Sequence, residues 1–460
     1  MCSCNKLKYV LVLTISFLRC NANRPMSNVS IQNLLVTSSD VLANTVGPPT
    51  KLPTTIADFM ETAYIDPVLN SLRDVIDNSD KFIRDYRSNE NNEDATLNIE
   101  KLAFKYGYSM ETHKVKTDDG YILGVHRIPK GGPVVFLMHG IFGSSDDFVI
   151  AGPANGFAYL LSNEGYDVWM GNARGNKHSF HHVQFNSSEP IFWDFSWHEI
   201  GYYDLPAMID HALHTSNSST LKYVGHSQGT TTFFVMASER KEYNKKVALM
   251  VALSPVAFMG KVRSPIARLI APEMSVLYEL LSSMGLYEFL PDNDSIKLFK
   301  DIVCGAGTTA EILCNNLILL FVGFDLAQLN VTNLPVLFGH SPSKVSVKQL
   351  VHYSQNIVAK DFNKYNYGKS QNLRHYRAAV PPRYALHRVS APVSLFYSEA
   401  DWLAHPDDVN RLHQKLPNAI DIYKVPYKNF SHLDFLFAKD VKILIYDRLR
   451  KVLSLFDSPN

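Results

Sequence analysis

One short stretch of the chain reads Leu221-Lys222-Tyr223-Val224-Gly225-His226-Ser227-Gln228-Gly229-Thr230. An apolar run comes first, the pattern G-x-S-x-G follows, and a run with helical character begins at Thr230. This order predicts a strand, a tight turn and a helix, with the Ser227 hydroxyl held clear of the backbone as a nucleophile. Gly225 and Gly229 suit such a turn, because side chains there would collide where strand and helix pack. The alternative is a glycine-rich structural turn whose serine only caps the helix.

The composition is that of a globular protein with a large core. The chain has 460 residues, of which 46% are hydrophobic and 19% charged. This length allows two or three domains, although a single α/β enzyme with insertions also reaches it. A formal net charge of +1 leaves no basic excess to meet phosphates, so we expect no nucleic acid partner.

The first 22 residues have the pattern of a signal peptide. Lys6 and Lys8 precede an apolar run from residue 9 to residue 18, and small residues follow near Ala22. The run is too short to span a bilayer, and a buried N-terminal strand is the alternative. We therefore expect a secreted protein or one of the lysosomal lumen, without a transmembrane segment. Residues 23–96, rich in Ser, Asn and Asp, are predicted to be a partly helical extension or propeptide.

An oxidising compartment would also act on cysteines and asparagines. Outside the signal segment and its edge only Cys304 and Cys314 remain, and we expect them to form one disulfide. Two free buried thiols are the alternative. Six N-x-S/T sequences are candidates for N-glycosylation: Asn28, Asn186, Asn217, Asn293, Asn330 and Asn429.

Strand-like runs recur along the rest of the chain. Residues 111–117 and 121–128 flank the turn signal Asp118-Asp119-Gly120 and predict a hairpin. Buried-type strands follow, separated by helical stretches, at residues 134–138, 166–170, 221–224, 247–253, 393–397 and 420–425. Their nearly continuous apolar character predicts an α/β fold with a mostly parallel sheet that helices cover on both faces.

A serine nucleophile in such a fold needs an oxyanion hole, an acid and a histidine, with the last two in that chain order. The loop from His139 to Gly143 follows the first buried strand, so the backbone N–H groups of Ile141 and Gln228 are candidates for the oxyanion hole. Asp401 follows the strand at residues 393–397, where a sheet end would present it to the serine. Its rivals are Glu399, Asp407 and Asp408, the last two at the start of an expected helix.

Three histidines follow Asp401 in the chain. His413 has helical spacing among polar residues, and His405 is too close to Asp401 to cross the site. His432 lies in a loop after the strand at residues 420–425, from which an imidazole can reach the serine. Position therefore favours His432 as the base that takes the proton of Ser227, with Asp401 orienting the imidazole.

Several motifs in order resemble the acid lipase family of the α/β-hydrolase superfamily, which includes gastric and lysosomal acid lipases and insect relatives. The resemblance runs from about residue 97 to the C-terminus. It rests on Lys105-Tyr106-Gly107-Tyr108, Thr117-Asp118-Asp119-Gly120-Tyr121-Ile122-Leu123, Arg127-Ile128-Pro129, His139-Gly140-Ile141, Asp167-Val168-Trp169-Met170-Gly171-Asn172-Ala173-Arg174-Gly175-Asn176, Tyr203-Asp204-Leu205-Pro206-Ala207, Gly225-His226-Ser227-Gln228-Gly229, Gly323-Phe324-Asp325, Asp401-Trp402-Leu403-Ala404 and His432-Leu433-Asp434-Phe435.

The resemblance implies an α/β-hydrolase fold, a lipid substrate at a lipid–water interface, and no cofactor or metal. It matches Ser227, Asp401 and His432 to the family's triad, and it matches Ile141 and Gln228 to its oxyanion positions. It also matches Cys304 and Cys314 to the family's disulfide. The acid loop departs from the family, because Ser398-Glu399-Ala400-Asp401 stands where a glycine-rich turn is usual.

The remaining feature is an insertion, residues 254–384, between the two parts of the predicted core, residues 97–253 and 385–460. Its many apolar residues at helical spacing are either ordinary core or the inner face of a cap and lid, with Leu280 and Leu281 expected to face lipid. The sequence thus predicts a neutral-lipid esterase acting on triacylglycerols, sterol esters or both, of unknown oligomeric state. The alternatives are a serine esterase for smaller esters and a non-catalytic lipid-binding or storage protein.

Overall fold

The computed structural model describes residues 84–86, 88–89, 91–289, 321–323 and 325–457. All of them fall within one unit of the chain, Asn70–Leu290 and Ile318–Asn460. The predicted signal peptide, most of the extension at residues 23–96, Cys304, Cys314 and the sequons at Asn28 and Asn293 lie outside the described residues. Nothing in the structure bears on those predictions.

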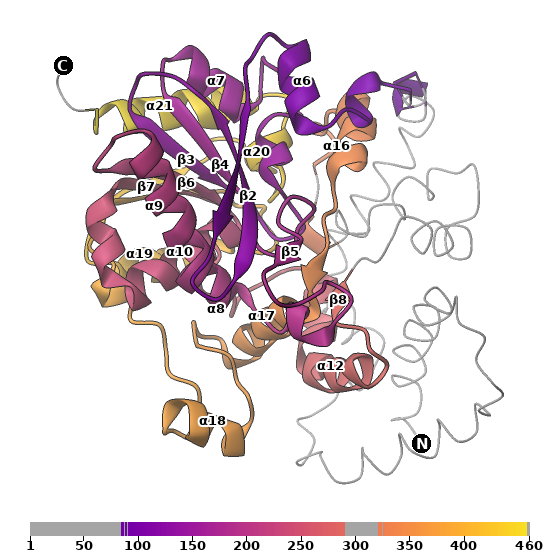
Figure 1. Cartoon of the computed structure of the whole chain (residues 1–460), viewed down its shortest axis with the longest axis vertical. Coiled ribbons are helices and arrows are strands. Elements are labelled where there is room, and N and C mark those ends of the chain that lie inside the picture. The colour runs from indigo at the N-terminus through magenta and orange to yellow at the C-terminus, as the bar shows by residue number, and fades with distance from the viewer. Residues whose placement is uncertain (1–83, 87, 90, 290–320, 324, 458–460) are drawn as a thin grey trace. The chain divides into compact units, whose positions relative to one another are not determined.

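A mixed sheet organises the described part of the chain (Figure 1). Its main path has the order β1-β2-β4-β3-β6-β7-β10-β11, and the short β5 (His181–His182) pairs with β2. The antiparallel hairpin is β1 (Glu111–Lys116) and β2 (Tyr121–Ile128). The parallel strands are β3 (Val134–Met138), β4 (Asp167–Gly171), β6 (Leu221–His226), β7 (Val247–Leu253), β10 (Val393–Tyr397) and β11 (Ala419–Lys424). Each predicted strand is therefore confirmed, and its ends differ from the predicted ones by at most two residues.

Helices cover both faces of this sheet, and that is why the central strands are buried throughout and mostly apolar. Figure 1 shows α7 (Phe157–Asn163) and α21 (Asp447–Ser454) on one face, with α9 (Leu205–Thr215), α10 (Gln228–Glu239) and α19 (Pro406–Lys415) on the other. Every residue of β3, β4 and β6 is buried. The predicted fold class is confirmed. One detail was wrong, because α10 begins at Gln228 and not at Thr230.

Arg174 explains why three of the sequence motifs occur together. Its buried guanidinium donates to Asp119 at 2.6 Å and pairs with Asp204 at 2.6 Å, and it lies 4.0 Å from the centre of the Tyr121 ring. The loop after β4, the turn of the β1–β2 hairpin and the start of α9 are thereby joined. Loss of one partner would leave a buried charge unpaired, which typically costs 3–5 kcal/mol.

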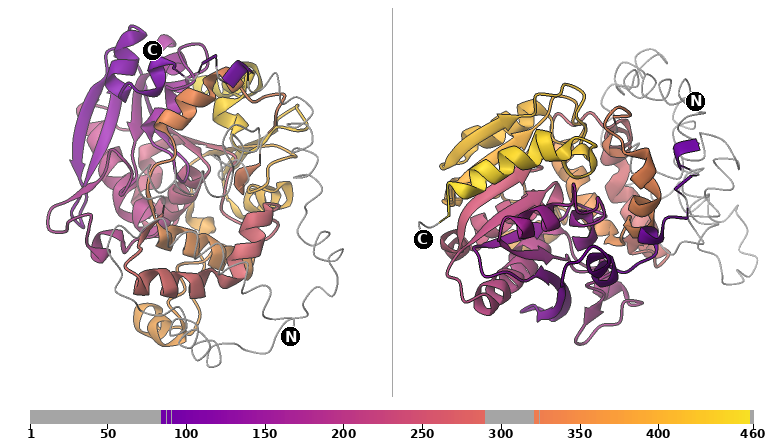
Figure 2. Two further views of the ribbon diagram at one scale, coloured as in Figure 1. Left: turned by 90° about the vertical axis from the view of Figure 1, so that its right-hand side faces the viewer. Right: turned by 90° about the horizontal axis from the view of Figure 1, so that it is seen from above.

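The insertion between β7 and β10 is mainly helical in its described part. It contains α11 (Pro265–Ile270), α12 (Met274–Ser283), α16 (Leu334–His340), α17 (Val347–Ala359) and α18 (Lys369–Tyr376), and a two-stranded sheet of β8 (Glu288–Phe289) and β9 (Val345–Ser346). In both views of Figure 2, α12 (red) and α17 (orange) lie side by side, and their elements contact each other.

A small apolar cluster of its own holds α12 and α17 together. Met274 and Leu281 of α12 are buried there against Val347 and Val351 of α17. The expectation that Leu281 faces lipid is therefore wrong, since this side chain belongs to a core, and Leu280 is half-buried. The large apolar side chains exposed on α11, α12 and the C-cap of α12 are Leu269, Val276 and Met284.

Candidate active site

Ser227 occupies a strained turn between β6 and α10. Its φ of 52° and ψ of −117° lie outside the regions that ordinary residues prefer. A Cβ at Gly225 would come within 2.8 Å of the Gly229 backbone, and a Cβ at Gly229 would come within 2.3 Å of the Met138 carbonyl oxygen. Both glycines are thus required by close backbone approach, and the strand–turn–helix order predicted around Ser227 is present.

Three side chains from distant parts of the chain form one hydrogen-bonded row. His432 follows β11 in a loop before α20 (Asp434–Phe437), and its Nε2 lies 2.8 Å from Ser227 Oγ. Asp401 follows β10, and each of its two carboxylate oxygens lies 2.9 Å from His432 Nδ1. All three residues are buried. The structure therefore brings together the three residues that the sequence selected.

None of the rival side chains bonds to this row. Glu399 forms an exposed ion pair with a lysine, and Asp407 and Asp408 lie in the first turn of α19, as the sequence predicted. His405 is the N-cap of the same helix, where its Nδ1 accepts from the Asp407 N–H at 3.1 Å. His413 lies within α19 and is half-buried.

The surroundings of Asp401 keep its carboxylate charged. Burial raises the pKa of this group, but the neighbouring His432 and hydrogen bonds from His432, Ser254 and the Ala404 N–H bring the pKa down to about 2. The N–H groups of Leu403 and Ala404 donate at 2.8 and 2.9 Å. Asp401 can therefore remain ionised well into the acidic range.

Ser254 is a site residue that the sequence analysis missed. It directly follows β7, is fully buried, and has a φ of 51°. Its hydroxyl donates to Asp401 Oδ2 and lies 2.6 Å from His432 Nδ1. In the structure β7 lies between β6 and β10, so the carboxyl end of β7 brings Ser254 to the same edge of the sheet as Ser227 and Asp401.

The loop after β3 lies beside Ser227 and bears one of the predicted oxyanion groups. Gly140, Ile141 and Phe142 line a cavity of about 40 Å³ together with Ser227 and His432. Among the residues that the structure describes, neither the Ile141 N–H nor the Gln228 N–H donates a hydrogen bond. Both groups are thus available to a carbonyl oxygen next to the serine.

Two buried histidines support this arrangement in their neutral forms. Burial lowers the pKa of His139 to about 4 and that of His226 to about 3. His139 donates from Nδ1 to the Gly140 carbonyl at 2.7 Å and accepts the Ala173 N–H at Nε2. His226 donates from Nε2 to the His432 carbonyl at 3.0 Å. They fix the loop after β3 and the backbone of the catalytic histidine candidate.

The insertion closes over this site through several contacts. The Gln228 side-chain amide donates to Gln349 of α17 at 2.8 Å, and the Ser343 N–H donates to the Phe142 carbonyl at 2.7 Å. The rings of Phe142 and Phe289 lie 5.8 Å apart. Small-molecule sites usually measure about 300–1,000 Å³. A cavity of about 40 Å³ is far too small for a lipid acyl chain.

The remaining predictions concern the surface and ions. Asn186, Asn217 and Asn429 are exposed, whereas Asn330 is half-buried. Within the described ranges, no group of three His, Cys, Asp or Glu side chains has the arrangement of a metal site. Nor does any helix in that part of the chain have the length and hydropathy to cross a membrane.

Comparisons with known proteins identify the family of this chain. A family model described as a partial alpha/beta-hydrolase lipase region matches residues 99–152, and one for the alpha/beta hydrolase fold matches residues 133–275. Lipase 1 of Drosophila melanogaster is 43% identical over 363 residues, which cover 78% of this chain and 80% of that protein. The chain belongs to the acid lipase family of the α/β-hydrolases.

Two more distant proteins share the sequence pattern or the fold of this chain. Gastric triacylglycerol lipase of Rattus norvegicus is 35% identical over 368 residues, which cover 78% of this chain and 92% of that protein. A crystal structure from Sulfolobus solfataricus superposes with a TM-score of 0.50 at 12% identity, over 75% of this chain and 94% of that one, and supports the fold alone. Members of this family are carboxylic ester hydrolases.

Proposed function

We propose that this chain is a secreted or lysosomal lipase that hydrolyses the ester bonds of neutral lipids, triacylglycerols or sterol esters. The observation that carries the proposal is the row Ser227–His432–Asp401, with distances of 2.8 and 2.9 Å, in a member of a lipase family. The names of the relatives support a triacylglycerol substrate. The predicted signal peptide supports the destination.

The reaction follows from the positions of the groups. His432 Nε2 takes the proton of Ser227 Oγ as that oxygen attacks the ester carbonyl carbon, and Asp401 stabilises the imidazolium that forms. The N–H groups of Ile141 and Gln228 would receive the developing oxyanion, a contact typically worth about 3–4 kcal/mol for one donor. His432 then protonates the leaving alcohol, and the same residues activate water to release the fatty acid.

The closed cavity favours a substrate that displaces the insertion. We propose that residues 254–384 act as a cap and lid on the core of residues 97–253 and 385–460. Leu269, Val276 and Met284 expose apolar surface on α11 and α12. At about 25 cal/mol per Å², a few hundred Å² moved onto lipid would contribute several kcal/mol and hold the lid open.

A covalent probe and three substrates test the proposal. A fluorophosphonate should label the protein at Ser227, and Ser227→Ala should abolish labelling and lower turnover by several orders of magnitude. Triolein, cholesteryl oleate and a short water-soluble ester, compared from acidic to neutral pH, identify the substrate class. Turnover of the soluble ester alone would make the chain an esterase for small substrates. Lipid binding without labelling would make it a carrier.

A further inference from the structure

The segment that follows α17 carries charge of one sign. Between Asp361 and Glu399 the sequence contains no acidic residue, in a chain whose overall net charge is only +1. The same segment contains six basic residues: Lys364, Lys369, Arg374, Arg377, Arg383 and Arg388. The rest of the chain is therefore net negative, and the positive charge of the molecule is concentrated around α18.

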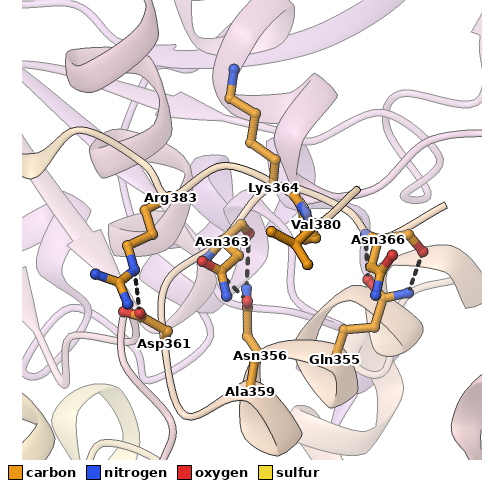
Figure 3. A pocket seen from close by; sticks show the side chains of 10 residues that line it. Gln355, Asn356, Ala359, Asp361, Asn363, Lys364, Asn366, Val380 and Arg383 are labelled. Atoms are coloured by element: carbon orange, nitrogen blue, oxygen red, sulfur yellow. Dashed lines mark hydrogen bonds and ion pairs between the residues drawn. The ribbon is translucent and has the colours of Figure 1, made fainter. Parts of the chain in front are cut away.

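This segment is attached to α17 through a polar pocket of about 350 Å³ (Figure 3). Gln355 exchanges two hydrogen bonds with the Asn366 backbone, and Asn356 does the same with the Asn363 backbone. The polar groups of this pocket are thus bonded to one another, and they anchor the chain just before α18, where Asn363 also forms a backbone bridge with Arg383 from the other side of the helix. Figure 1 shows α18 standing away from the sheet, below α17.

The side chains that α18 and its flanks present to solvent are basic and apolar. Lys369, Arg374, Arg377 and Arg388 are exposed, and none forms an ion pair with any residue that the structure describes. Lys364 and Arg383 of the same segment are paired with acids instead. Two large apolar side chains lie among the unpaired cations, with Leu373 50% exposed and Val380 71% exposed.

We propose that this surface, Lys369 to Arg388, docks the protein onto an anionic phospholipid surface. Lysine and arginine side chains near such a surface each contribute favourably, and the attraction fades within about 10 Å at 0.1 M salt. Leu373 and Val380 favour lipid over an anionic glycan or nucleic acid, because only lipid offers hydrocarbon beside the negative headgroups. The surface lies outside the residues that form the candidate active site, so docking does not depend on the proposed hydrolysis.

Sedimentation with vesicles tests the proposal on the full chain, in a Ser227→Ala background so that lipid is not consumed. The vesicles are phosphatidylcholine alone or phosphatidylcholine with phosphatidylglycerol. We expect tighter binding to the anionic vesicles, and weaker binding as salt rises. The double variant Lys369→Glu/Arg374→Glu should weaken that binding by about tenfold or more. Glu at the first position of α18 favours the helix dipole, whereas Glu at Arg374, in the last turn, opposes it, so a melting curve checks that this variant is folded.

Matched variants separate this surface from net charge. Lys241→Glu/Lys245→Glu makes the same change in charge on exposed residues before β7 and should leave vesicle binding within about twofold. Leu373→Ser/Val380→Ser keeps every charge and should still reduce binding several-fold. The proposal would be overturned if both charge variants lost vesicle binding to the same extent. It would also be overturned if the protein bound a sulfated glycan but not the vesicles. With Ser227 intact, the α18 variants should hydrolyse a short soluble ester at the rate of the unmodified chain. Failure of the proposed function is recognised separately, because the unmodified chain would then not hydrolyse emulsified lipid even where it binds the vesicles.

Discussion

The candidate active site and the inserted helices differ in how their residues are held. Ser227, Asp401 and His432 are buried, and His432 is hydrogen-bonded to both of the others. The described part of the insertion instead exposes apolar side chains, with Leu269 at 49% and Met284 at 40%. From this difference we propose that hydrolysis depends on groups that stay fixed, whereas access to the site and adsorption to lipid depend on exposed apolar surface.

The largest effect should come from breaking the fixed row at its histidine. His432→Ala should lower kcat/KM on a soluble ester by about 10⁴-fold or more, because the row acts as a unit. His405→Ala and His413→Ala should each retain most of the activity, since neither contacts Ser227. Steady-state kinetics on folded proteins makes the comparison. Equal damage from His405→Ala would show that the base was assigned to the wrong imidazole.

Much of the fixed row was predictable because chain order and strand ends determine it. Ser227, Asp401 and His432 each follow a strand of the parallel sheet, and the carboxyl ends of parallel strands meet at one edge. Ser254 has the same placement and was missed, because a single serine has no pattern that separates it from ordinary loop residues. Its role depends on the hydrogen bond from its hydroxyl to Asp401, and that contact exists only in the folded chain.

The insertion was less predictable for a physical reason. Apolar residues at helical spacing reveal that a helix has a packed face but not what packs on it. Leu281 illustrates this, because its partners Val347 and Val351 lie far along the chain on α17. The unpaired cations of α18 were also overlooked, since an overall charge of +1 hides a local excess.

Ser254 offers a smaller test within the fixed row. Ser254→Ala removes one hydrogen bond to an ionised carboxylate, a contact worth about 1.5–3 kcal/mol, so kcat/KM should fall by roughly tenfold to a hundredfold. Loss of this donor should also raise the pKa of Asp401 and move the acidic limb of the pH–rate profile to higher pH.

A matched serine provides the control for that change. Ser398 is equally buried and lies in the same acid loop, but its hydroxyl has no partner among the described residues. Ser398→Ala should therefore leave both the rate and the acidic limb unchanged. A shifted limb in Ser398→Ala, or an unshifted one in Ser254→Ala, would mean that Ser254 only fills space.

The insertion can be tested by placing charge on its exposed and buried faces. Leu269→Asp/Met284→Asp should lower hydrolysis of a long-chain triacylglycerol emulsion on the order of tenfold, because charge disfavours contact with hydrocarbon. Activity on a short soluble ester should persist. Leu281→Asp places a charge in the cluster with α17, so it should lower the melting temperature and both activities together. Equal loss on both substrates at unchanged stability would contradict the lid.

The smallest expected effect is on the pH dependence of stability, and it comes from buried acids that titrate. Burial raises the pKa of Asp147 and Asp434 to about 7 each, and the charge of Asp146 adds to the effect at Asp147. An unfolded aspartate has a pKa of about 3.9, so the folded state binds extra protons between about pH 4 and pH 7. This stabilisation is fully present below about pH 4 and is lost as pH rises through 7.

Asp401 acts in the opposite direction, because its folded pKa of about 2 gives stability that is present above about pH 4 and lost as pH falls through 2. Together these groups predict maximal stability near pH 4, a decline from there to about pH 7, and a melting temperature several degrees lower at pH 8 than at pH 5. Asp434→Asn removes one titrating group and should flatten the decline on the alkaline side, whereas Asp118→Asn, at an exposed turn, should not. Melting curves from pH 4 to pH 8 measure this dependence. A higher melting temperature at acidic pH would support an acidic compartment for the protein. A melting temperature that rose from pH 5 to pH 8 would show that Asp147 and Asp434 are ionised in the folded protein at no cost.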